Sequence, residues 1–236
     1  MSTPTVNYRF YATLLDGFQY YLSKVDDDNA FQDFIDRLNR KPFHSEAAMK
    51  GTAFNELIDL LITQKASIRD FPTDKKGNLL FPYEENGDKK EYPFKPDIVR
   101  IFVSKLVGSV PQKFTEAVLP TRRGNVMLYG YVDEILKNKV IDIKTTGRYT
   151  FPKYLKAWQS KVYPYCLKKQ GVFVDTFEYL VTDFRNVYVE EYPYKPEKDI
   201  VELQRFSEQL IDFIETHKHL ITSPKLFNAE AHQNIS

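Results

Sequence analysis

The stretch that decides the fold runs Tyr129-Gly-Tyr-Val-Asp133-Glu-Ile-Leu-Lys-Asn-Lys-Val-Ile-Asp142-Ile-Lys144-Thr-Thr146. Its pattern on both sides of Asn138-Lys139 is typical of two β-strands joined by a tight turn. Side chains alternate between the two faces of a strand, so Asp142 and Lys144 share a face. If the loop has two residues, Asp133 pairs opposite Lys144 and the three charged groups converge. A three-residue loop would break this parity.

Two carboxylates beside a lysine can support phosphodiester chemistry. Carboxylate oxygens suit Mg²⁺ or Mn²⁺, and such an ion polarises a phosphodiester and lowers the pKa of a bound water. The lysine can orient or deprotonate that water and offset developing negative charge. The alternative is a hairpin with ordinary surface charges, which a bare Asp-x-Lys pattern favours. Here the charges alternate with Ile141 and Ile143 in a strand that reads as buried, which indicates a site.

Composition limits the other classes of function. The 236-residue chain fits one domain, and its 42% of hydrophobic residues can form a sizeable core. A formal net charge of +1 argues against a protein that simply coats nucleic acid. The single cysteine, Cys166, excludes a disulfide framework and a four-cysteine metal site within this chain. The start lacks a signal-peptide pattern and no stretch approaches about 18 apolar residues, so we expect a soluble, cytoplasmic protein without membrane contact.

Periodicity along the chain predicts helices and strands in a mixed order. Helices are expected over residues 8–23, 30–38, 47–64, 96–107, 152–168 and 196–220. Strands are expected over 113–119, 126–136, 140–145, 173–182 and 187–192, with a loop or small hairpin near 79–83. This order predicts an α/β (α+β) fold with a central mixed β-sheet flanked by helices. We expect a single domain over 1–236, with an N-terminal helical part at about 8–65 and a core at about 110–220.

The chain resembles the PD-(D/E)XK nuclease superfamily, in the RecB-like branch that includes lambda-type exonucleases. That branch has a Gly-x-x-Asp strand, then Asp-x-Lys, then a helix with Gln-x-x-x-Tyr. This chain has Gly130-Tyr-Val-Asp133, Asp142-Ile-Lys144 and Gln159-Ser-Lys-Val-Tyr163. Gln159 and Tyr163 are one turn apart on one helix face, which alone would indicate only the polar edge of an amphipathic helix. The resemblance covers roughly residues 50–165 and implies a restriction-endonuclease-like core.

The resemblance also implies roles for individual residues. Asp133 and Asp142 would be metal ligands, with the Ile143 backbone carbonyl completing the site. Lys144 would be the catalytic lysine, and Gln159 and Tyr163 would position the scissile phosphate or the substrate strand.

Two positions in the resemblance are open. In Gly51-Thr-Ala-Phe-Asn55-Glu56, Asn stands where the family has a His ligand. Either the Asn55 amide oxygen binds metal, or Glu56 or Asp59 substitutes for it, or the segment is only an exposed helical turn. Glu116 matches an acidic position of many relatives and is either a ligand or a strand-edge charge.

The implied activity is metal-dependent hydrolysis of DNA, by an exonuclease in recombination, repair or phage DNA processing. The expected cofactor is Mg²⁺ or Mn²⁺, and the expected partners are DNA and a recombination or replication protein. A catalytically silent relative that binds nucleic acid or protein is the alternative, which Asn55 favours, whereas the intact Asp133, Asp142 and Lys144 favour the enzyme. A restriction-type endonuclease is a weaker alternative. The sequence leaves polarity, strand preference, DNA versus RNA and oligomeric state open.

A few further residues outside the motifs also have an expected place in the structure. Arg122-Arg123 precede the Asp133 strand in a turn, where they either touch phosphates or are solvated. Pro96-Asp97 reads as a helix start with a surface Asp. His44 and His232 lie in expected loops. Trp158 is expected in the core.

Overall fold

The computed structural model describes residues 5–227 except 25, 43–44 and 86. His44 and His232 lie outside the described residues, as does most of the C-terminal tail. The elements are β1 (Tyr8–Tyr11), α1 (Ala12–Leu22), α2 (Asp28–Leu38), α3 (Glu46–Ile62), β2 (Leu79–Glu85), β3 (Asp88–Phe94), α4 (Pro96–Leu106), β4 (Val110–Thr121), β5 (Gly124–Leu136), β6 (Lys139–Thr145), α5 (Gln159–Lys169), β7 (Thr176–Thr182), β8 (Val187–Pro193) and α6 (Pro196–Thr216).

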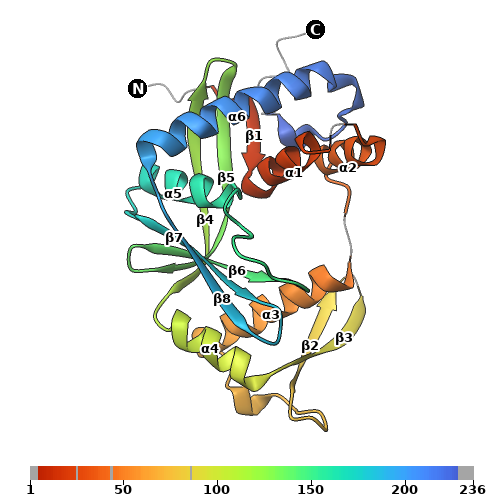
Figure 1. The fold of residues 1–236 in the computed structure, drawn as a ribbon, viewed down its shortest axis with the longest axis vertical. Coiled ribbons are helices and arrows are strands. Elements are labelled where there is room, and N and C mark those ends of the chain that lie inside the picture. The colour runs from red at the N-terminus through yellow and green to blue at the C-terminus, as the bar shows by residue number, and fades with distance from the viewer. Residues whose placement is uncertain (1–4, 25, 43–44, 86, 228–236) are drawn as a thin grey trace.

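A mixed sheet forms the centre of the fold. Its order is β1-β5-β6-β7-β8, with β4 on the other edge of β5. The β1–β5 and β6–β7 pairs are parallel, and the other pairs are antiparallel. In Figure 1, α1, α2, α5 and α6 lie in the upper half, and α3, α4 and the β2–β3 hairpin lie in the lower half. The predicted α/β class with a central mixed sheet and flanking helices is confirmed.

Each side of the sheet has its own group of buried apolar residues. The first group joins α1, α2, α5 and α6 to the sheet and includes Phe18, Val162 and Phe177. The second joins α3, α4, β2 and β3 to the other face, where Ile141 and Ile143 of β6 are buried. Since neighbouring residues of β6 point to opposite faces, Asp142 and Lys144 face the side of α1 and α5.

Two predicted helices begin later than their periodicity suggested. Residues 8–11 form β1, which pairs with residues 126–129 of β5 and buries Phe10 completely. The helix expected from residue 152 begins at Gln159. Before it, the backbone N–H groups of Lys153 and Tyr154 donate to the Glu190 carboxylate at 2.8 and 2.9 Å. These distant partners replace the hydrogen bonds that a helix would supply.

Other predicted starts are confirmed by their capping residues. The Asn29 N–H donates to the Asp27 carboxylate at 3.0 Å, so the acidic run does begin α2. Pro96 lies in the first turn of α4, and the Asp97 side chain is 89% exposed. β2 and β3 pair as an antiparallel hairpin, which is one of the two alternatives expected near 79–83 and is longer than expected. Trp158 is buried.

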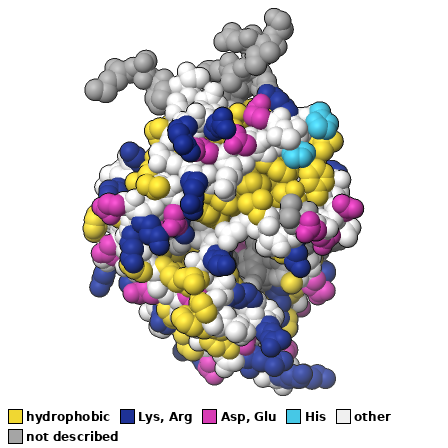
Figure 2. Space-filling view, turned by 45° about the horizontal axis from the view of Figure 1, so that its top comes forward, with side chains coloured by type: hydrophobic (Ala, Val, Ile, Leu, Met, Phe, Trp, Pro, Cys, Tyr) yellow, Lys and Arg dark blue, Asp and Glu magenta, His cyan; other side chains and the backbone are white. Residues whose placement is uncertain are grey.

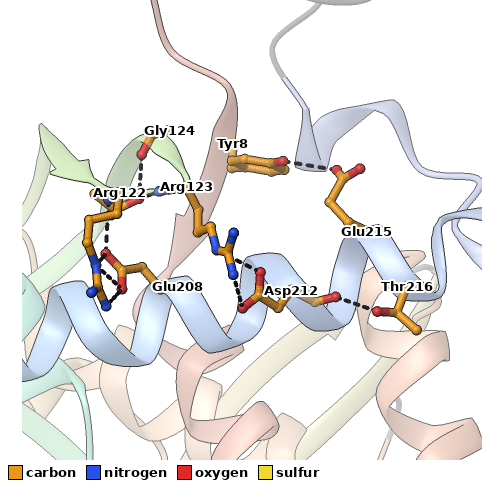
Figure 3. A network of polar contacts seen from close by, with 9 residues as sticks. Tyr8, Arg122, Arg123, Gly124, Glu208, Asp212, Glu215 and Thr216 are labelled. Atoms are coloured by element: carbon orange, nitrogen blue, oxygen red, sulfur yellow. Dashed lines mark hydrogen bonds and ion pairs between the residues drawn. The ribbon is translucent and has the colours of Figure 1, made fainter.

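The turn between β4 and β5 is fastened to α6 by ion pairs (Figure 3). Arg122 lies 2.6 Å from the Glu208 carboxylate, and Arg123 lies 3.0 Å from Asp212. Tyr8 donates to Glu215 at 2.9 Å nearby. Both arginines therefore have partners within the chain, and the sequence alternatives of a phosphate contact or a solvated turn did not include this arrangement.

The surface adds two observations. The face in Figure 2 is hollowed, and Lys and Arg side chains lie at the margin of the hollow.

Among the described residues, no helix combines the length and apolar character needed to cross a membrane.

Candidate active site

The sheet divides along one edge of β5. There, β1 pairs with β5 as far as Tyr129, whereas β6 pairs with it only from Glu134 onward. Residues 130–133 are left between the two partners. On the opposite edge, the β4 ladder skips the position facing Asp133, where Gln112 has a φ of 50°. Asp133 therefore lies at a point where β5 is not paired regularly with β4 on one edge or with β1 and β6 on the other. Its side chain can approach β6 there.

The turn between β5 and β6 lies one residue earlier in the chain than predicted. Leu136 pairs with Lys139, so the two loop residues are Lys137 and Asn138, not Asn138 and Lys139. Continuing this register places Asp133 opposite Asp142, which corrects the expected pairing with Lys144. Both turns have two residues, so the parity is the same and the three charged side chains still converge.

Asp142 and Lys144 form the buried centre of the cluster. Lys144 Nζ lies 2.7 Å from Asp142 Oδ2, and their side chains are 25% and 2% exposed. Gln159, the first residue of α5, donates from Nε2 to Asp142 Oδ1 at 2.7 Å. Burial lowers the pKa of Lys144, but the charges of Asp142 and Asp133 outweigh it and hold that pKa above its usual range. Lys144 is therefore a cation at neutral pH.

Asp133 is the second carboxylate of the cluster. One of its oxygens, Oδ2, accepts the Ile143 backbone N–H at 2.9 Å, which fixes the side chain against β6. Burial and the charge of Asp142 raise its pKa to about 7, although Lys144 and the Ile143 N–H oppose the shift. Burial also raises the pKa of Asp142. The site thus holds two carboxylates that are reluctant to ionise together beside one ammonium group.

Tyr163 adds a hydroxyl to the same place. A Cβ at Gly130 would lie 2.8 Å from a carbon of the Tyr163 ring, so a side chain at 130 would displace the ring. Burial and the charge of Asp142 hold the pKa of Tyr163 well above its usual range, so its hydroxyl keeps its proton. The structure therefore brings together Asp133, Asp142, Lys144, Gln159 and Tyr163, the five residues that the resemblance names for catalysis.

One stripe of residues on α3 faces the β5–β6 hairpin from the side of the sheet opposite to α1 and α5. A Cβ at Gly51 would lie 2.6 Å from Thr145 Oγ1, just after Lys144. Two turns further on, the charge of Asp59 raises the pKa of Glu134 and that of Asp133. Asn55 lies midway along this stripe, and its Oδ1 is buried with no hydrogen-bond partner among the described residues. Its amide oxygen is thus available between the two ends of the stripe.

The structure also shows a buried acid pair that sequence reasoning missed in part. Glu134 is fully buried and accepts from the Ser109 hydroxyl at 2.6 Å. Burial raises its pKa to about 8, with Asp59 contributing. Asp59 had been named only as a substitute ligand, and Glu134 was not named. The available signal was its position beside Asp133, which places it on the face toward α3.

Asp16 of α1 was also missed. Its carboxylate accepts the Trp158 backbone N–H at 2.7 Å, immediately before Gln159. Burial raises its pKa to about 6, although the Trp158 N–H and Lys144 oppose this. Asp16 lines a recess of about 410 Å³ that Lys144 and Gln159 also line. Its sequence signal was weak, because it lies on a helix far from the motifs.

Two proposed metal ligands lie elsewhere. Glu56 is exposed and lines a groove with Tyr83 and Lys90 of the β2–β3 hairpin. Glu116 is on β4, with its carboxylate 3.8 Å from Arg9 and 40% exposed. The contacts of the described residues do not join either side chain to Asp133 or Asp142. Their positions correspond better to the surface charges considered as alternatives.

The donor set fits a divalent cation without forming a full protein cage. Among the described residues, no three His, Cys, Asp or Glu side chains are grouped to hold a metal ion. Asp133 and Asp142 nevertheless supply two adjacent carboxylates, and Asp142 Oδ2 has no hydrogen bond, only the ion pair with Lys144. A second positive charge there would favour ionisation of both carboxylates. Mg²⁺ commonly uses one or two carboxylates and water, which fits this set.

Comparison with known proteins gives only distant similarity. No protein-family model matches the chain, and no curated protein matches its sequence. The solved structure of SSO0001 is similar with a TM-score of 0.46 and 14% identity, covering 89% of this chain and 79% of that one. A "Putative exonuclease" from Eubacterium rectale has a TM-score of 0.45 and 11% identity, covering 80% and 74%. Both scores are below 0.5, so functional inference depends on this chain's own site.

Proposed function

We propose that this protein is a metal-dependent nuclease of the PD-(D/E)XK type that hydrolyses DNA phosphodiester bonds. The observation that carries the proposal is the buried Asp142–Lys144 ion pair, with Asp133 and Gln159 directly beside it. A buried carboxylate pair with raised pKa values is unfavourable for stability, and such groups cluster at functional sites. An exonuclease acting in recombination, repair or phage DNA processing is the specific form that we favour.

The residues have distinct tasks in this proposal. Asp133, Asp142 and the Ile143 carbonyl would hold Mg²⁺ or Mn²⁺. Asn55 lies on α3, which packs on the face of Ile141 and Ile143, and among the described residues no contact joins it to the two carboxylates. The ion, when bound, would polarise the phosphodiester and acidify a water molecule. Gln159 holds Asp142 through Nε2, which fixes the carboxylate orientation. Tyr163, with its proton retained, can donate a hydrogen bond to a phosphate oxygen.

Lys144 has the role of a fixed positive charge. Its pKa is held above the usual range by Asp142 and Asp133, so it carries a proton at the pH of the cell. A protonated ammonium group stabilises negative charge that develops on the phosphate and cannot itself accept a proton from water. A divalent cation on Asp142 and Asp133 would offset the charges that raise this pKa, so both roles expected from the sequence, charge stabilisation with orientation of water and deprotonation of water, stay in the proposal.

The proposal is tested with purified protein and linear or circular DNA. We expect degradation of linear DNA in Mg²⁺ or Mn²⁺, none in EDTA, and sparing of circular DNA if free ends are required. Lys144→Met should lower the rate by about 10²–10³-fold, because it removes a charge that acts in the transition state. Asp142→Asn should lower it at least as much.

A matched control separates charge loss at the site from charge loss in general. Asp97→Asn removes a carboxylate that is 89% exposed and should leave cleavage unchanged. Circular dichroism should show that all variants keep their secondary structure. Cleavage that survives both site substitutions would overturn the assignment. DNA binding without cleavage in any metal would instead identify the catalytically silent relative.

A further inference from the structure

The connection between β6 and α5, residues 146–158, carries exposed apolar side chains at the candidate site. It starts two residues after Lys144 and ends directly before Gln159, so both of its ends belong to the site. Phe151 and Leu155 within it are 69% and 54% exposed. Single exposed apolar residues are common on protein surfaces, so this exposure needs further support before it indicates a function.

The first support is that aromatic contacts fix the connection on both sides of Phe151. The Tyr149 ring stacks on Tyr188 of β8, with ring centroids 4.1 Å apart. The Tyr154 ring stacks on Tyr179 of β7 at 4.8 Å. Phe151 lies between these two anchored tyrosines. Phe151 is therefore exposed on a fixed backbone. Binding of a ligand to its ring would cost little entropy, because the backbone is already ordered.

Two carboxylates also accept hydrogen bonds from the backbone of this connection. Glu190 accepts the N–H groups of Lys153 and Tyr154 at 2.8 and 2.9 Å. Asp16 accepts that of Trp158 at 2.7 Å, at the end of the connection. The segment thus has the rigidity expected of a binding element rather than of a passive link.

The second support is a local excess of positive charge. Residues 143–174 contain seven basic and no acidic residues, in a chain whose net charge is +1: Lys144, Arg148, Lys153, Lys156, Lys161, Lys168 and Lys169. Within the described part of the chain, the exposed Arg148 and Lys156 form no ion pair with a carboxylate. An anionic chain alongside the connection would therefore meet unneutralised cations.

The third support is the recess that the connection borders. It has a volume of about 410 Å³, within the size range of small-molecule sites. Tyr154 and Ala157 line one part of it, with Lys144 and Gln159 of the site. Tyr20 of α1, 58% exposed, lines it as well. An aromatic-lined recess next to the reacting residues could take one nucleotide.

We propose that this connection binds an unpaired DNA strand, with Phe151 as a stacking platform for a base and Arg148 and Lys156 as phosphate contacts. Base stacking on aromatic rings beside a basic track is how sequence-independent single-strand binding works. A paired base has its faces covered by its neighbours, so the platform selects single-stranded DNA or a separated strand end. The placement beside catalysis rests on the proposed nuclease function, and the substrate class goes beyond it.

The first test measures binding of a labelled oligothymidine of about 12 nucleotides by fluorescence anisotropy in EDTA, where cleavage is blocked. Phe151→Ala should weaken binding about tenfold. Phe173→Ala is the matched control, since Phe173 is 70% exposed but follows the far end of α5. It should bind as the wild type does. Equal affinities of the wild type and Phe151→Ala would overturn the proposal.

The second test keeps an aromatic ring at the position. The chain has one tryptophan, Trp158, which is buried, so Phe151→Trp adds an exposed reporter. Oligothymidine should quench the added fluorescence with affinity retained, and a blunt hairpin duplex should quench it much less. Fluorescence that does not respond to the single strand, or responds equally to the duplex, would contradict the proposal.

Failure of this inference differs from failure of the nuclease proposal. If the wild type cleaves DNA with metal but Phe151→Ala binds and cleaves equally well, only the stacking role is wrong. If no metal supports cleavage but Phe151→Ala loses strand binding, the nuclease proposal is wrong and the binding element stands. In an active enzyme, Phe151→Ala should raise KM for single strands with little change in kcat.

Discussion

Two charged networks in this molecule have opposite electrostatic characters. At the turn between β4 and β5, Arg122 donates from its backbone N–H and its guanidinium to both oxygens of Glu208, at 2.9 and 2.6 Å (Figure 3). Hydrogen bonds from Arg122 lower the pKa of Glu208. At the candidate site, burial and a neighbouring carboxylate raise the pKa of Asp133 to about 7. The first network therefore stabilises its carboxylate as an anion, whereas the second stabilises the Lys144 cation but raises the pKa of its carboxylates.

The difference extends to unmatched atoms. On the α3 side of the β5–β6 hairpin, Asn55 Oδ1 is buried without a hydrogen-bond partner among the described residues. A buried unsatisfied polar group costs about 1–3 kcal/mol, so an arrangement of this kind lowers stability. The arginine network is complete within the chain, whereas the Asn55 amide oxygen beside the site is an acceptor without a donor among the described residues. We therefore expect substitutions in the two regions to change the free energy of unfolding by different amounts, with different dependence on pH and salt.

The largest effect should come from Lys144→Met. It leaves two carboxylates beside each other without their cation, and breaking a buried pair typically costs about 3–5 kcal/mol. Urea denaturation at pH 8 should show a loss of this size in the free energy of unfolding. The loss should shrink near pH 5, because the pKa of Asp133 is about 7 and protonation removes part of the repulsion.

Lys144→Arg is the control for this measurement, since it keeps the charge and should lose much less. A loss that is equal at pH 5 and pH 8 would show that Lys144 stabilises the fold by contacts other than its charge. Mg²⁺ should recover part of the stability of Lys144→Met at pH 8, if the two carboxylates bind it.

A smaller effect of the opposite sign is expected for Asp133→Asn. The folded pKa of Asp133, about 7, lies above its usual value, so its contribution to stability is full below about pH 4 and is lost as pH rises through 7. The Asn variant avoids that loss and should be more stable than the wild type by about 2 kcal/mol at pH 8 without metal. The two should converge near pH 4. A variant less stable than the wild type at pH 8 would contradict the raised pKa.

Local patterns were enough to predict most of this site. Alternation along β5 and β6 placed Asp133, Asp142 and Lys144 on convergent faces, and the error of one residue in the turn preserved that parity. Helical spacing placed Gln159 and Tyr163 together. These relations depend on neighbours within about ten residues, where periodicity is informative.

What the sequence did not predict depends on distant partners. The four residues of β1 fit a helical pattern, and they become a strand by pairing with residues 126–129. The late start of α5 depends on carboxylates from Glu190 and Asp16, far away in the chain. The acid pair of Asp59 and Glu134 forms only when α3 packs on the hairpin. No local pattern encodes these contacts, because each needs the tertiary arrangement that it helps to form.

The smallest effect should come from Arg122→Met, in the network that is already satisfied. The Arg122 side chain is 86% exposed, and surface ion pairs contribute little and are screened by salt. We expect the melting midpoint to fall by at most about two degrees at low salt and less at about 1 M NaCl. The loss in Lys144→Met should persist in salt, because buried pairs are screened less. DNA cleavage by Arg122→Met should equal that of the wild type, since the Arg122 guanidinium is already paired with Glu208. A clear loss of DNA affinity would instead show that Arg122 leaves Glu208 to contact a phosphate. The network of Figure 3 would then belong to the substrate-binding surface.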